Sequence, residues 1–145
     1  MQTPFTELYI DDLKAALRQV LPDKADLVFG YIPVVSGEDI ARNGPVCAIV
    51  PMSVSIGRDT RGTRIVTVSY ALTYAAECAD AFTSVEPHVI VACDIADAVS
   101  SFSDDEDTYH VEEFEWPEIF DMELMRNSTL FRAGMTFNLV FYLEP

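Results

Sequence analysis

Two stretches of the chain repeat apolar residues at the three- and four-residue spacing of a single helical face. In the first, the apolar positions are Ile10, Leu13, Leu17 and Val20. Pro22 follows them and cannot continue a helix, so the pattern predicts a helix over Leu8–Leu21. In the second, the apolar positions are Val91, Ile95, Ala98 and Phe102. This helix is expected to begin near Pro87, because proline is tolerated in the first turn.

Three long stretches alternate apolar and polar residues with the period of two that is typical of strands with one buried face. The first two flank a polar turn bounded by Gly57 and Gly62, which predicts an antiparallel hairpin. Their apolar positions are Val46, Ala48, Val50, Met52, Val54 and Ile56, then Val66, Val68, Tyr70, Leu72 and Tyr74. Pro51 predicts a sheet edge or a bulge in the first of these strands. The third stretch is the final strand, Phe131–Leu143.

Two shorter stretches complete the pattern. Leu27–Val35 is rich in β-branched and aromatic residues and is a possible strand. Tyr109–Trp116 predicts a bulged strand, because its apolar positions change phase between Val111 and Phe114. The whole order predicts an α+β fold: a mainly antiparallel sheet with a long hairpin and two helices packed on one face. The length of 145 residues favours one domain over residues 1–145.

The net charge of -15 comes from one part of the chain. Between Ile65 and Met125 there are 15 acidic residues and no Lys or Arg, whereas the remainder has 9 acidic and 9 basic residues. Such a surface repels phosphate groups, which argues against tight nucleic-acid binding but allows DNA to pass without sticking. No apolar run reaches the roughly 20 residues of a membrane span. The first residues do not resemble a signal peptide, so synthesis in the cytoplasm is expected.

Residue types that carry chemistry are few, and none forms a known motif. The chain lacks a phosphate loop, a nucleotide-binding glycine pattern and a nucleophile elbow. Cys47, Cys78 and Cys93 lack metal-ligand spacing and are expected to be reduced and mostly buried. His88 has no neighbouring ligand set either. We therefore expect no catalytic residues, no cofactor and no metal site, and hence no enzyme.

Two acidic neighbourhoods leave alternatives open. His110 lies in sequence near Asp107, Glu112 and Glu113, which fits a surface histidine and also allows a loose contact with a divalent ion. The cluster Asp104–Asp107 lacks the glycine and distal glutamate of a calcium-binding loop, so a solvated loop after the second helix is the better interpretation.

Two segments are candidates for contact with another protein. Arg58, Arg61 and Arg64 place three of the nine basic residues in the hairpin turn, either for solubility and protection of the sheet edge or for docking on an acidic neighbour. The connection Glu118–Ser128 contains apolar residues, among them Phe120 and Met122, which either fold under the core or contact a partner.

The layout of these elements resembles that of tail terminator, or tail-completion, proteins of long-tailed bacteriophages. The resemblance lies in the order: the helix Leu8–Leu21, the Pro-flanked strand start Gly44–Val50, the long hairpin, a second helix and the alternating strand Phe131–Leu143. The acidic stretch and the long segment before the last strand look like additions to that layout. The match covers most of the chain and contains no catalytic motif.

The resemblance implies a virion structural protein that is assembled in the host cytoplasm. It would cap the end of the tail tube and join it to the head or neck as a ring, usually of six copies. The implied partners are the chain itself, the tail tube protein and a head or neck connector protein, with DNA passing through passively and no membrane contact. Two alternatives stay open: another head-tail joining protein, such as a head-completion or neck protein, and a small-molecule-binding or enzymatic α+β domain.

Overall fold

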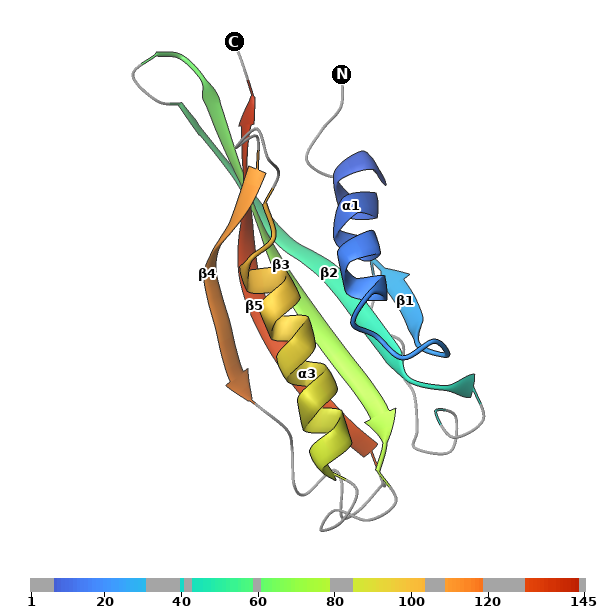
Figure 1. Cartoon of the computed structure of the whole chain (residues 1–145). Coiled ribbons are helices and arrows are strands. Elements are labelled where there is room, and N and C mark those ends of the chain that lie inside the picture. The colour runs from blue at the N-terminus through green and yellow to red at the C-terminus, as the bar shows by residue number, and fades with distance from the viewer. Residues whose placement is uncertain are drawn as a thin grey trace.

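A computed structural model of the chain describes residues 7–30, 40, 43–58, 61–78, 85–103, 109–118 and 130–143. The elements in chain order are α1 (Glu7–Arg18), β1 (Asp26–Phe29), β2 (Val46–Arg58), β3 (Arg64–Glu77), α3 (Val85–Ser100), β4 (Tyr109–Glu118) and β5 (Leu130–Leu143). Figure 1 shows the strands as one long, twisted sheet with α1 and α3 in front of it.

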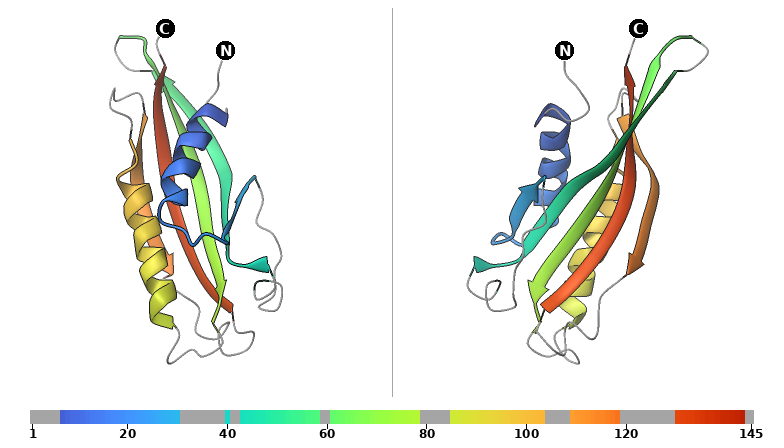
Figure 2. Two further views of the ribbon diagram at one scale, coloured as in Figure 1. Left: turned by 45° about the vertical axis from the view of Figure 1, so that its right-hand side comes forward. Right: turned by 180° about the vertical axis from the view of Figure 1, so that it is seen from behind.

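The sheet has the order β1-β2-β3-β5-β4. Only β1 and β2 run parallel, whereas β2–β3, β3–β5 and β4–β5 are antiparallel. Both α1 and α3 pack on the same face, as the two views of Figure 2 show. The opposite face, on which neither α1 nor α3 lies, is called the helix-free face below. The predicted α+β class, the mainly antiparallel sheet and the placement of both helices on one face are therefore confirmed.

The core lies between the helices and the two central strands. Alternate residues of β3 and β5 are buried towards α1 and α3, as the period of two predicts. The rings of Tyr70 and Phe137 stack with centroids 5.4 Å apart, and Leu13 and Leu17 of α1 belong to the same cluster. Fully burying an aliphatic or aromatic side chain of this size contributes about 1.5–3 kcal/mol, so this layer supplies most of the stabilisation.

The first two predicted segments are shorter than expected. The helix ends at Arg18 and not at Leu21. Beyond it the chain tightens into a turn, in which the amide of Val20 bonds to the carbonyl of Leu17, three residues back. Of the possible strand Leu27–Val35, the structure has β1 over Asp26–Phe29, and residues 31–35 lie outside the described residues. The second helix begins at Val85, which places Pro87 in its first turn as predicted.

One expectation about β2 is wrong. The alternation from Val46 to Ile56 predicts a single apolar face, but the register shifts between Pro51 and Ser53. Before the shift Cys47 and Ile49 lie on the helix side of the sheet, and after it Val54 and Ile56 do so, opposite Val68 and Val66. A bulge inserts one residue, and one residue moves every later side chain to the other face. The bulge expected at Pro51 is thus present, and it accounts for the switch.

The bulge predicted in β4 is confirmed. Its register with β5 shifts between Glu112 and Glu115 and again before Glu118. Glu113 adopts a left-handed backbone with φ 51°, which residues other than glycine adopt rarely. After the shift Phe114 and Trp116 pack against the core cluster. The bulge thereby keeps the apolar residues of β4 on the helix side although their sequence spacing changes.

At one end of the helix-free face, Ile40, Ala75 and Leu130 form a second, small buried cluster. Along the rest of this face most side chains of β3 and β5 are half-buried or exposed, for example Thr67, Ser69 and Asn138. Thr73 and Val140 are buried. Within the described part of the chain, neither helix has the length and apolar character of a membrane span.

Candidate protein-interaction site

The distal end of the β2–β3 hairpin extends past both helices (Figures 1 and 2). We refer to residues 52–58 of β2 and 61–64 at the turn as the hairpin arm. All residues of β2 from Met52 to Arg58 are exposed. Gly62 in the turn has φ 83°, a backbone conformation that glycine adopts without strain. The arm therefore contributes little to the core of its own chain.

The arm presents large apolar side chains to solvent. Met52, Val54 and Ile56 are 66%, 42% and 70% exposed. Val66 and Val68, which lie directly opposite on β3, are buried. Apolar side chains that are grouped on one projecting strand, and not scattered singly, are typical of a contact surface.

The backbone of the arm also has an open edge. β1 pairs with β2 only from Val46 to Ile49, and the amide of Gly30 extends this pairing to the carbonyl of Ile49. From Val50 to Arg58 no described residue pairs with the outer edge of β2. Such an edge is a template for further pairing unless it is short, bulged or covered.

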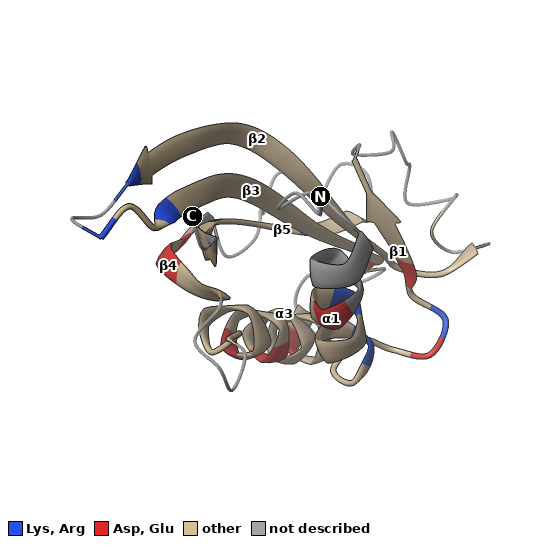
Figure 3. Ribbon diagram, turned by 90° about the horizontal axis from the view of Figure 1, so that it is seen from above, with Lys and Arg blue, Asp and Glu red and all other residues tan. Residues whose placement is uncertain are grey.

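The three arginines predicted as a docking site are brought together at the tip of the arm. Arg58 and Arg64 are directly opposite each other in the hairpin register, and Arg61 lies in the turn between them. All three are exposed, and Figure 3 shows this basic end of the hairpin separated from the acidic residues of α3. Like charges in directly opposed positions are unfavourable within a hairpin. A carboxylate-bearing partner would relieve that repulsion.

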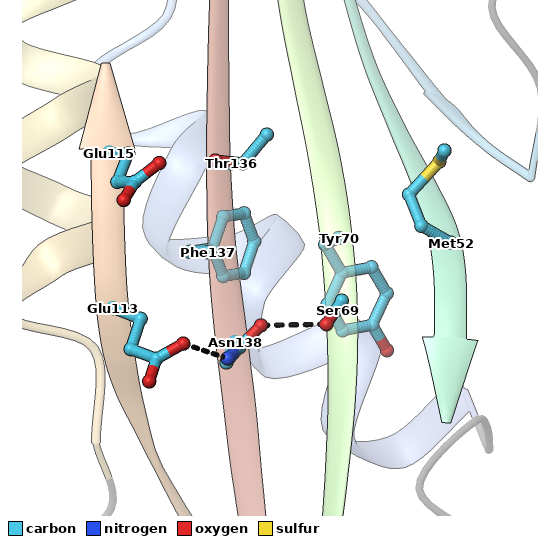
Figure 4. A pocket seen from close by; sticks show the side chains of 8 residues that line it. All are labelled: Met52, Ser69, Tyr70, Glu113, Glu115, Thr136, Phe137 and Asn138. Carbon is cyan, nitrogen blue, oxygen red and sulfur yellow. Dashed lines mark hydrogen bonds between the residues drawn. The ribbon is translucent and has the colours of Figure 1, made fainter. Parts of the chain in front are cut away.

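A second surface lies on the helix-free face, across three strands. Ser69 of β3 donates a hydrogen bond to Asn138 Oδ1 of β5 at 2.7 Å. Asn138 Nδ2 donates in turn to Glu113 Oε2 of β4 at 2.8 Å (Figure 4). These residues border a shallow hollow of about 270 Å³, which Met52, Glu115 and Thr136 also line. Sequence reasoning missed this surface, because its residues are far apart in the chain; Ser69 and Asn138 alone are 69 positions apart.

The bulge of β4 concentrates acidic groups beside this hollow. Glu112 and Glu115 are opposite Asn138 and Thr136 in the register, so both lie on the helix-free face. The hydrogen bond to Asn138 brings the carboxylate of Glu113 to that face as well. All three glutamates are exposed. Arg132 is exposed on the same face but lies further along β5, opposite Ala75. The three glutamates therefore make the region around the hollow acidic.

The histidines and cysteines do not assemble into a chemical site in the part of the chain that the structure describes. His110 Nε2 is 2.8 Å from Glu112 Oε1, and no group of three or more His, Cys, Asp or Glu is placed to hold a metal among these residues. Cys47 and Cys78 are buried, and burial raises the pKa of the Cys47 thiol to about 12. Cys93 is exposed, so the expectation of mostly buried thiols holds for two of the three cysteines.

His88 packs on the core and not on a ligand set. Its ring lies 5.4 Å from that of Phe131, centroid to centroid. Burial lowers the pKa of His88, and a backbone hydrogen bond and the charge of Glu77 oppose this effect only in part. The remaining candidates, Phe120 and Met122, lie outside the described residues, as does the acidic cluster Asp104–Asp107.

No protein-family model matches the chain, and no curated protein matches it. Among solved structures, the chain is similar to one in the "virion of native gene transfer agent (GTA) particle". The two are 11% identical, the match covers 88% of this chain and 85% of that chain, and the TM-score is 0.48. A likeness at this level supports no functional conclusion.

Proposed function

We propose that this chain is a structural protein of a phage-like virion. In this role it caps the end of the tail tube and joins it to the head or neck as an oligomeric ring, without enzymatic activity. One observation carries the proposal. The chain has a two-layer body and a hairpin arm that adds almost nothing to its own core, yet exposes Met52, Val54 and Ile56 beside three arginines. Such an arm is accounted for by assembly.

The uneven charge supports the same role. The arm is basic, whereas the long central stretch from Ile65 to Met125 carries 15 acidic residues and no basic ones. Opposite charges on two separate surfaces of one chain favour contact between copies and speed their association. The acidic surface formed by that central stretch would let DNA pass with little attraction. The ring of about six copies and the tail tube as a partner come from the resemblance to tail terminator proteins.

Removal of the chain from its particle tests this proposal. Particles assembled without it are expected to show heads and tails that do not join, and adding the purified chain is expected to restore joining. Electron microscopy of negatively stained particles measures both outcomes. Normal, joined particles that lack the chain would contradict a joining role.

A further inference from the structure

The apolar strip and the arginines of the arm share one face of the sheet. Val54 and Ile56 are opposite Val68 and Val66, whose side chains face the helices. Arg58 continues the alternation from Ile56, so it and Arg64 opposite it lie on the same side. The arm therefore presents a continuous helix-side surface of two exposed aliphatic side chains followed by two cations.

The hollow, with Glu113 and Glu115 at its edge, lies on the opposite, helix-free face of the same sheet (Figure 4). Glu112 lies on that face as well. The two surfaces thus point away from each other across one sheet, so a single copy cannot bring them together. They are complementary in charge, because Arg58 and Arg64 are on one and Glu112, Glu113 and Glu115 are on the other. The arm surface of one copy can therefore meet the hollow only on another copy.

We propose, as a deepening of the proposed function, that the hairpin arm of one copy lies on the helix-free face of the next copy. Ile56 would then cover the hollow between β3, β5 and β4, and Arg58 and Arg64 would face the glutamates beside it. Different surfaces meet in such a contact, so it is heterologous and repeats from copy to copy until a ring closes.

The hollow suits this occupant in polarity. Met52, at the base of the receiving copy's own arm, supplies an apolar wall, and Thr136 is exposed on β5. The hydrogen-bonded series from Ser69 through Asn138 holds the carboxylate of Glu113 in place before any partner arrives. A preorganised carboxylate forms charge-assisted hydrogen bonds with a guanidinium at a smaller entropic cost than a free one.

Cysteine cross-linking tests the contact in the full-length chain, with Cys93 replaced by Ser because it is exposed. Ile56→Cys places a thiol on the arm, and Thr136→Cys places one in the hollow. Mixing the two chains with a short bismaleimide is expected to give a cross-linked heterodimer that neither chain gives alone. The matched control is Ile90→Cys, which is also exposed but lies on α3. It is expected to give at least tenfold less product with Thr136→Cys.

Two results would overturn the inference. Strong cross-linking of Ile56→Cys to itself would mean that the β2 edges of two copies pair symmetrically, and absence of any heterodimer would exclude the contact. The outcome is separable from that of the proposed function. If the heterodimer forms but particles join normally without the chain, the contact stands and the joining role is wrong. If no heterodimer forms but particles need the chain for joining, only the contact is wrong.

Charge reversal provides a second measurement. Arg58→Glu with Arg64→Glu, or Glu112→Lys with Glu115→Lys, is expected to weaken self-association at least tenfold. The chain that carries all four reversals restores opposite charges and is expected to regain most of the association, as measured by sedimentation. Failure of the combined variant to recover, with both parents folded, would contradict the pairing of these two surfaces.

Discussion

Two isoleucines on the same strand should respond in opposite ways to the same substitution. Ile49 is fully buried beneath the helices, whereas Ile56 is 70% exposed on the hairpin arm. Threonine keeps the β-branched shape, so strand propensity changes little at either position. We expect Ile49→Thr to destabilise the fold, and Ile56→Thr to weaken assembly and leave the fold intact.

The magnitudes follow from burial. Ile49→Thr removes buried apolar volume and buries a hydroxyl, which together cost about 2–5 kcal/mol. For a chain of this size that lowers the melting temperature by roughly 5–15 °C. At Ile56 the surface still available for burial is 70% of the residue. Full burial of such a side chain contributes about 1.5–3 kcal/mol, so a partner gains about 1–2 kcal/mol from covering it. The association constant should fall roughly 5- to 30-fold in Ile56→Thr.

Thermal unfolding and sedimentation equilibrium on the same samples measure the two effects. The wild-type chain and Ile49→Thr, the latter kept below its melting temperature, serve as references for association. If Ile56→Thr lowered the melting temperature as much as Ile49→Thr does, the arm would belong to the core. If it left association unchanged, the exposed strip would have no role in assembly.

Three further outcomes are expected. Replacing Arg58, Arg61 and Arg64 together with Ser should change the unfolding free energy by no more than about 0.5 kcal/mol while weakening assembly, and a large stability loss with assembly intact would reverse the assignment. Burial lowers the pKa of His88, so the unfolded chain binds more protons and the unfolding free energy should fall as the pH drops below about 6.5. Denaturant titrations between pH 7.5 and 5 should show a smaller decline in His88→Gln, and an equal decline would contradict this origin. Tyr70→Phe should leave the melting temperature unchanged or raise it, because no described residue is hydrogen-bonded to the buried hydroxyl, and a loss above about 1 kcal/mol in chemical denaturation would show that it has a partner.

The regular elements were predictable because each carries a local pattern. The spacing of Leu13 and Leu17 marks a helix, and the alternation from Phe131 to Leu143 marks a strand, without reference to the rest of the chain. The bulge of β4 was also predictable, because Val111 and Phe114 break the period of two.

The side of the sheet that each residue faces, and the surface sites that result, were harder to predict from the sequence. Pro51 indicates an edge or a bulge in β2, but the apolar alternation continues unbroken through Met52 in sequence, so it does not show that the apolar face changes sides. The hollow depends on which strands become neighbours, and β5 inserts between β3 and β4 only in the folded sheet. The one signal for the hollow in the sequence was the adjacent pair Glu112 and Glu113. Two successive acidic residues in a regular strand point to opposite faces, so both reach the same face only where a bulge turns one of them.

Assembly is the central claim, and electron microscopy of the purified chain, alone and mixed with tail tubes, tests it most directly. Closed rings with a uniform number of copies are expected, either free or seated on tube ends. Ile56→Thr and the variant with Arg58, Arg61 and Arg64 replaced by Ser should both reduce the fraction of rings. Monomers alone, in the presence as well as the absence of tube ends, would contradict the account.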